Sequence, residues 1–195
     1  MANLEQAPSR TMPNLLHVLP AFANQSEHRV NTIVELNSNT INKYELITET
    51  GHLKLDRVGY SSLAYPFAYG CLPRTWDEDG DPLDIEIVNV TEPLVPGSIV
   101  EARIIGIMTF DDGGEVDDKV IGVIADDKRM DHIKSFEQLG KHWITETTYY
   151  WEHYKDLKKP GTCTVNGFFG VEKAVEIIKS CEKRYLSEID PNLIN

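Results

Sequence analysis

The order of short strand-like segments is the feature that most limits how this chain can fold. Six segments between residues 31 and 127 are rich in β-branched residues and are separated by turn sequences such as ETG and EPLVPG. They read TIVEL, NKYELI, HLKLDRVGY, LDIEIVNV, SIVEARIIGIMTF and KVIGVIADD. Because no helical pattern lies between them, an alternating α/β fold is disfavoured. We expect a barrel or a strongly bent sheet.

Helical spacing appears only late in the chain. The first predicted helix lies within residues 140–161 and ends at Pro160-Gly161, and the second covers residues 171–186. The apolar stripe of the first helix consists of Trp143, Thr147, Tyr150, Trp151 and Tyr154. That of the second consists of Val171, Ala174, Val175, Ile178 and Cys181. The predicted class is therefore α+β, and mainly β.

Length and composition indicate one domain. With 195 residues and 41% hydrophobic content, the chain can bury a single core. We interpret residues 1–30, which include three prolines, as an N-terminal extension lying on the surface, and residues 31–195 as the domain. No secretory signal and no long apolar run is visible, and the three cysteines are far apart. We expect a cytoplasmic protein without disulfides.

The charge balance bears on partners. A formal net charge of −12 repels nucleic acid and acidic membrane surfaces. We therefore expect neither as a partner.

Acidic residues are concentrated in DEDGDPLDIEI, residues 77–87. Its centre is Asp79-x-Asp81-x-x-Asp84, a spacing that by itself also fits an exposed acidic turn. An EF-hand loop requires Gly at its sixth position, but counting from residue 77 or 79 that position is Pro82 or Asp84. The cluster is therefore not an EF-hand.

A second acidic segment, DDGGEVDDK, covers residues 111–119 and joins two predicted strands. At one rim of a barrel, the two acidic loops could meet. Two carboxylates ~4 Å apart repel by roughly 4 kcal/mol at an effective dielectric near 20. Such side chains either stay apart in solvent or hold hard cations, for which Mg²⁺ or Mn²⁺ is a better candidate than Ca²⁺.

Basic residues accompany the acidic ones. Strand alternation puts Lys43 and Glu45 on one face, and it puts Arg57 at the end of an apolar row. Surface salt bridges remain an alternative for each of them. Together with the carboxylates, however, they suit a highly anionic, metal-bound ligand such as a phosphate ester or anhydride.

Several enzyme classes lack their motifs. The sequence contains no GxxxxGK[ST] loop, no HExxH and no G-x-S-x-G elbow. P-loop chemistry, zinc hydrolysis and serine catalysis therefore have no support.

The ordered set of these residues resembles the soluble family I inorganic pyrophosphatases. DGDPLDI matches the family hallmark, and the resemblance extends over roughly residues 31 to 185. The other matching positions are Glu35 in IVEL, Lys43 and Glu45 in KYEL, Arg57 in LDR, Tyr65 and Tyr69 in YPFAYG, Asp112, Asp117 and Lys119 in the second acidic segment, and Tyr154 and Lys155 in EHYKDL.

The resemblance implies a five-stranded OB-type β-barrel with helices packed outside, and Mg²⁺-dependent hydrolysis of pyrophosphate to two phosphates, with Mn²⁺ as a substitute. It implies a homo-oligomer, with a hexamer favoured over a dimer. Asp81 would be the general base. The metal ligands would be Asp79, Asp84, Asp112, Asp117 and Glu45. The phosphate-binding residues would be Lys43, Arg57, Tyr69, Lys119, Tyr154 and Lys155, supported by Glu35 and Tyr65.

Two departures from the family pattern matter. Gly113 follows Asp112 where the family often has an acid, which leaves the choice between Asp111 and Asp112 open, and the leader is long. Three other functions stay open: hydrolysis of a related polyphosphate anhydride, a non-catalytic OB-type binding module, and a degenerate metal or phosphate sensor. The net charge disfavours a nucleic-acid-binding module, which needs a basic groove.

Overall fold

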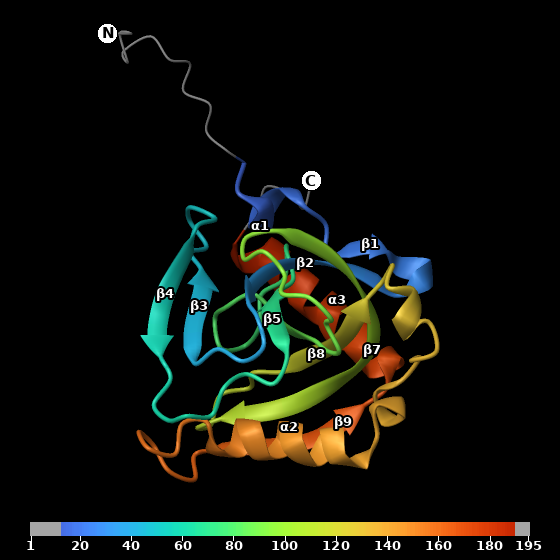
Figure 1. The fold of residues 1–195 in the computed structure, drawn as a ribbon. Coiled ribbons are helices and arrows are strands. Elements are labelled where there is room, and N and C mark those ends of the chain that lie inside the picture. The colour runs from blue at the N-terminus through green and yellow to red at the C-terminus, as the bar shows by residue number, and fades with distance from the viewer. Residues whose placement is uncertain (1–12, 190–195) are drawn as a thin grey trace, which may run out of the picture.

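A closed ring of five strands forms the centre of the molecule. The computed structural model describes residues 13–189 (Figure 1). Its ring runs through β2 (Arg29–Leu36), β5 (Ala68–Cys71), β6 (Asp84–Ile87), β8 (Lys119–Ile124) and β7 (Ile99–Asp112), and β7 pairs back with β2. Only the β6–β8 pair within this ring is parallel. The ring confirms the predicted five-stranded barrel.

Four further strands extend the barrel. β1 (Phe22–Asn24) pairs with β2, and β9 (Cys163–Phe169) pairs with β7. β3 (Asn42–Leu46) and β4 (Leu53–Val58) form a separate antiparallel hairpin beside the barrel (Figure 1). The sequence analysis did not predict β1, β5 or β9.

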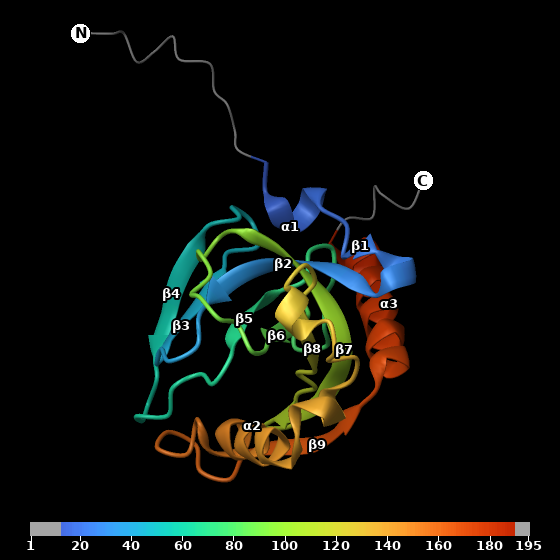
Figure 2. The ribbon, with the colours of Figure 1, turned by 45° about the vertical axis from the view of Figure 1, so that its right-hand side comes forward.

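The helices lie outside the strands, as predicted. α2 (Lys141–His153) and α3 (Val171–Glu188) pack on different parts of the barrel (Figure 2). The short elements are α1 (Leu15–Val18) and the 3₁₀ turns η2 (Gln25–Glu27), η3 (Lys128–Met130) and η4 (Phe136–Leu139). None of the helices within residues 13–189 is long and apolar enough to cross a membrane.

The two long helices cover two separate cores. α3 buries Ala174, Ile178 and Cys181 against aliphatic barrel residues. α2 contributes Tyr150 and Trp151 to an aromatic cluster with Tyr65, Phe67, Tyr69, Phe110 and Tyr154. Burying each of these side chains stabilises the folded state by roughly 1.5–3 kcal/mol. The cluster is therefore a stable base for the part of the barrel that α2 covers.

The leader is more integrated than predicted. Instead of lying on the surface as an arm, residues 13–29 bury Leu16 and Ala21 completely. His17 contacts the hydroxyl of Tyr185 through Nδ1 (2.7 Å) and the carbonyl of Thr48 through Nε2 (2.9 Å). Through His17 the segment thus contacts both α3 and the turn of the β3–β4 hairpin. It lies against the domain because its apolar pairs, LL and AF, pack into the core. Residues 1–12 of the predicted extension lie outside the described residues.

Candidate active site

A strongly polar pocket opens where the β3–β4 hairpin, the acidic loop before β6, the β7–β8 loop and the end of α2 meet. Its cavity is about 190 Å³. It is lined by Lys43, Glu45, Arg57, Tyr65, Tyr69, Asp79, Asp81, Asp112, Glu115, Asp117, Lys119, Trp151, Tyr154 and Lys155. An adjoining recess adds Glu35 and Asp84. The structure therefore brings every residue of the predicted site to one place.

The acidic loop is a tight turn that presents two carboxylates to the pocket. The N–H of Asp77 donates to the carbonyl of Asp81 (2.7 Å), and the N–H of Asp81 donates to Oδ1 of Asp79 (3.1 Å). Gly80 lies at φ 88°, in the left-handed region that favours glycine. Burial, followed by the negative charges of Asp117 and Asp84, raises the pKa of Asp79 to about 8. The turn therefore holds Asp79 close to other acidic groups.

Lys119 lies buried at the floor of the pocket. Its side chain is only 1% exposed, and its Nζ donates to Asp84 (2.9 Å) and Asp117 (2.6 Å). Asp84 and Lys119 are register partners on the parallel strands β6 and β8, which brings them together. Burial lowers the pKa of Lys119, but the charges of Asp117 and Asp84 outweigh it, and the net shift is upward. Lys119 is therefore a fixed positive charge.

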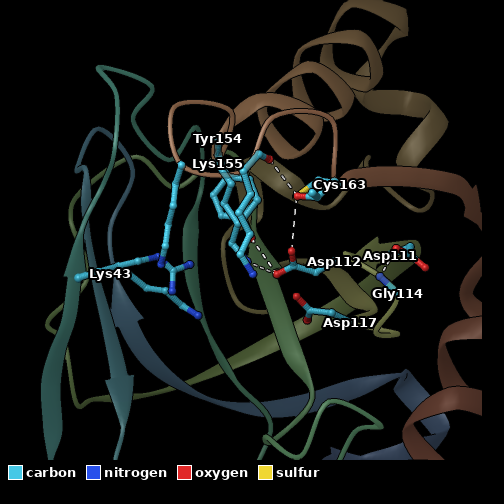
Figure 3. Close-up of polar contacts among 12 residues, drawn as sticks. Lys43, Asp111, Asp112, Gly114, Asp117, Tyr154, Lys155 and Cys163 are labelled. Carbon is cyan, nitrogen blue, oxygen red and sulfur yellow. Dashed lines mark hydrogen bonds and ion pairs between the residues drawn. The ribbon is translucent and has the colours of Figure 1, made fainter.

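Asp112 is the centre of a second polar cluster (Figure 3). Lys155 and the Tyr154 hydroxyl both donate to its Oδ2, the latter at 3.2 Å, and the Cys163 thiol donates to Oδ1 at 3.4 Å. Burial by itself would raise the pKa of Asp112. The hydrogen bond and charge of Lys155, with the hydrogen bonds of Cys163 and Tyr154, outweigh this effect, and the net shift is downward. Asp111 instead accepts the N–H of Gly114. Asp112, and not Asp111, thus lines the pocket.

The hairpin supplies positive charge to the other side of the pocket. Lys43, on β3, makes an ion pair with Glu45 (2.5 Å), and in Figure 3 it lies away from Asp112 and Asp117. Arg57, on β4, is paired with Asp56 (2.6 Å). Cations therefore line both sides of the pocket: Lys43 and Arg57 on the hairpin, and Lys119 and Lys155 among the carboxylates opposite.

Two groups at the site were not predicted. Trp151 was assigned only to the helix stripe, and Glu115 was quoted only within its loop, yet both line the pocket. Behind the pocket, Glu86 is fully buried and accepts the indole N–H of Trp151 (2.6 Å). Burial raises the pKa of Glu86 to about 8. The position of Trp151 three residues before Tyr154, on the same helical face, was a usable signal.

The donor chemistry of the pocket fits a hard divalent cation, because carboxylate oxygens are the ligands that such ions prefer. Across residues 13–189, however, no three acidic, His or Cys side chains are gathered so that they could hold a metal ion as they stand. Lys119 and Lys155 hold Asp84, Asp117 and Asp112 instead. Burial, followed by the crowding of negative charge, raises the pKa of Asp79, and a bound cation would favour its ionised form.

Comparison with known proteins agrees with this site. Residues 32–186 match the family model described as inorganic pyrophosphatase. The inorganic pyrophosphatase of Geobacillus stearothermophilus is 41% identical over 156 residues, which cover 80% of this chain and 93% of that protein. Soluble inorganic pyrophosphatase 3 of Arabidopsis thaliana is 43% identical over 149 residues, covering 76% of this chain and 68% of that one.

Solved structures extend the likeness to the fold. The crystal structure of an inorganic pyrophosphatase from Neisseria gonorrhoeae superposes with a TM-score of 0.83 at 36% identity, covering 88% of this chain and 98% of that one. The enzyme from Thermus thermophilus gives 0.80 at 36% identity, covering 89% and 99%. The chain therefore belongs to the soluble family I inorganic pyrophosphatases, as its acidic hallmark and the order of its charged residues predicted.

Proposed function

We propose that this chain hydrolyses inorganic pyrophosphate to two orthophosphates in the pocket described above. The observation that carries this proposal is the close pairing of cationic and acidic side chains around a cavity of about 190 Å³. The cationic side chains suit the phosphate oxygens, and the carboxylates suit the metal ions that accompany them. Family membership supports the same substrate.

Membership in the family implies a divalent metal cofactor, and we propose Mg²⁺, with Mn²⁺ as a substitute. The residues proposed to hold it are Asp79, Asp84, Asp112, Asp117 and Glu45, which all border the pocket or its recess. A bound divalent ion supplies positive charge that makes water more acidic and offsets the charge of the phosphates.

Phosphate binding is proposed for the cations and hydroxyls of the pocket, namely Lys43, Arg57, Tyr69, Lys119, Tyr154 and Lys155. Two further residues would hold them in place. Glu35 accepts the N–H of Leu46 (2.8 Å) at the end of β3, the strand that carries Lys43. Tyr65 packs against Tyr69 and Tyr150, with ring centroids 5.7 and 5.2 Å away.

Asp81 is the proposed general base, the group that takes the proton of the attacking water. It lies in the acidic loop at the pocket surface. Burial, together with the negative charges of Glu45 and Asp84, raises its pKa, which strengthens it as a base. A positioned carboxylate base typically contributes about 10²–10⁴-fold to a rate.

We also propose a cytoplasmic homo-oligomer, with a hexamer favoured over a dimer. Two aliphatic side chains of β4, Leu55 (44% exposed) and Val58 (53% exposed), are available for contacts between copies. The net charge of −12 argues against nucleic acid and membrane surfaces as partners. Light scattering of the purified chain measures its mass and separates the oligomeric states.

A phosphate-release assay tests the proposed function. Purified protein receives pyrophosphate with Mg²⁺, and parallel samples contain EDTA or receive ATP as substrate. We expect rapid release from pyrophosphate, none in EDTA, and slow release from ATP. Activity that persists in EDTA would refute the metal assignment, and a preference for ATP would refute the assigned substrate.

A further inference from the structure

A buried carboxylate lies behind the pocket and takes no part in the chemistry proposed above. Glu86 is 0% exposed, and its Oε1 accepts the indole N–H of Trp151 at 2.6 Å. Its Oε2 is buried with no hydrogen-bond partner in the described part of the chain. An unpaired buried oxygen is costly, so a carboxylate at this place requires a reason.

Strand geometry connects Glu86 to the floor of the pocket. Asp84 and Glu86 are two residues apart on β6 and therefore point to the same face of the sheet. Asp84 reaches the recess beside the pocket, and Glu86 follows one step further along the strand, opposite Tyr69 in the aromatic cluster. Glu86 thus approaches the site from behind.

Trp151 lies between Glu86 and the charged groups of the floor. It is 3% exposed and borders the pocket. Nζ of Lys119 lies 4.6 Å from the centroid of the Trp151 ring. The indole N–H of the same ring donates to Glu86. The same Nζ donates to Asp84 and Asp117. An indole that turned would therefore remove the surface on which this lysine rests.

We infer that Glu86 is a positioning residue for the reaction: by holding the indole of Trp151, it fixes Lys119 and, through it, Asp84 and Asp117. The role of Glu86 in the reaction rests on the proposed function, whereas its hydrogen bond to Trp151 can be tested separately. It predicts that the hydrogen bond to the indole, and not the negative charge of Glu86, is what the site requires.

Four variants separate these roles. Glu86→Gln keeps the accepting oxygen and replaces the unpaired one with an amide nitrogen. Glu86→Leu removes the acceptor, Trp151→Phe removes the donor, and the double variant removes both so that neither polar group is left unpaired. Ile178→Val, in the separate core under α3, is the control for a general loss of packing.

The first measurement is the indole N–H signals of ¹⁵N-tryptophan-labelled protein without added metal. The chain has three tryptophans, and the signal lost in Trp151→Phe identifies that of Trp151. We expect a downfield, slowly exchanging signal in the wild type and in Glu86→Gln, and an upfield shift in Glu86→Leu. A signal unchanged in Glu86→Leu would show that the contact is not made and would overturn the inference.

The second measurement is pyrophosphate hydrolysis at saturating Mg²⁺. We expect Glu86→Gln and Ile178→Val to keep the wild-type kcat and KM. Glu86→Leu should lose about tenfold or more in kcat, because misplaced groups slow the chemical step, and its KM should rise, because Lys119 is also proposed to bind phosphate. The double variant should be no slower than Glu86→Leu alone, because both changes act through the same contact. A kcat for Glu86→Leu equal to that of Ile178→Val, or losses that multiply in the double variant, would overturn the inference. An inactive wild type would instead refute the proposed function.

Discussion

Replacing Glu35 with Gln should remove a pH dependence of folding stability that can be worked out from the structure. Glu35 is 4% exposed, and its Oε1 accepts the N–H of Leu46 at 2.8 Å. Burial, and then the negative charge of Asp84, raises its pKa from 4.5 to about 8, against smaller opposite effects of Leu46 and Lys43. Gln is nearly isosteric, stays neutral at every pH, and keeps an oxygen for Leu46.

The sign of the effect follows from proton binding. Between pH 4.5 and about 8 the folded protein holds a proton on Glu35 that the unfolded chain has released. The stability from this group is therefore fully present below pH 4.5 and is lost as the pH rises to about 8. At about 1.4 kcal/mol per pH unit, the loss between pH 5.5 and pH 7.5 is roughly 3 kcal/mol.

The assay is urea unfolding of both proteins in EDTA, followed by tryptophan fluorescence at several pH values, one ionic strength and one protein concentration. The difference in unfolding free energy, wild type minus Glu35→Gln, should fall by roughly 3 kcal/mol from pH 5.5 to 7.5. The pH-dependent contributions of the titrating groups that both proteins share cancel in this difference. Excess Mg²⁺ should reduce the slope, because positive charge beside Asp84 favours ionised Glu35. A difference that is independent of pH would refute the reasoning.

Three other substitutions test the floor and the acidic loop. Asp79→Asn should lower phosphate release by at least about a hundredfold, the upper end of the loss for groups one shell further from a metal. Its unfolding free energy in EDTA should stay equal or rise because a like charge is removed, and a large loss of stability would contradict this. Asp81→Asn should lose about 10²–10⁴-fold in kcat, less at high pH where hydroxide replaces the base, so a pH profile identical to the wild type would contradict its role. Lys119→Met should lower the free energy of unfolding in urea by roughly 3–5 kcal/mol, since Asp84 and Asp117 lose their counter-charge. Added Mg²⁺ should restore part of this stability, and a variant as stable as the wild type would contradict the reasoning.

Much of the barrel could be predicted because its strands carry strong local signals. The segment SIVEARIIGIMTF was predicted as residues 98–110, and β7 covers Ile99–Asp112. β5 was missed because its four residues, AYGC, come directly after Pro66-Phe67 and carry no alternation. β9 was missed because it begins just after Pro160-Gly161 and includes Gly167. Both strands exist because pairing with β2, β6 or β7 compensates for a weak local preference.

The charged residues at the site could be found from sequence, whereas the group that supports them could not. In β6 the alternation Asp84-Ile85-Glu86-Ile87 reads as a strand with one face in water. In the closed barrel both faces are covered: Ile85 belongs to the aliphatic core under α3, Ile87 is also fully buried, and Glu86 faces the aromatic cluster under α2. The sequence pattern distinguishes the two faces of a strand, but only the packed helices decide whether the polar face meets solvent. The alternation alone would therefore put Glu86 on a solvent-facing side, whereas α2 closes over it and supplies the indole that it binds.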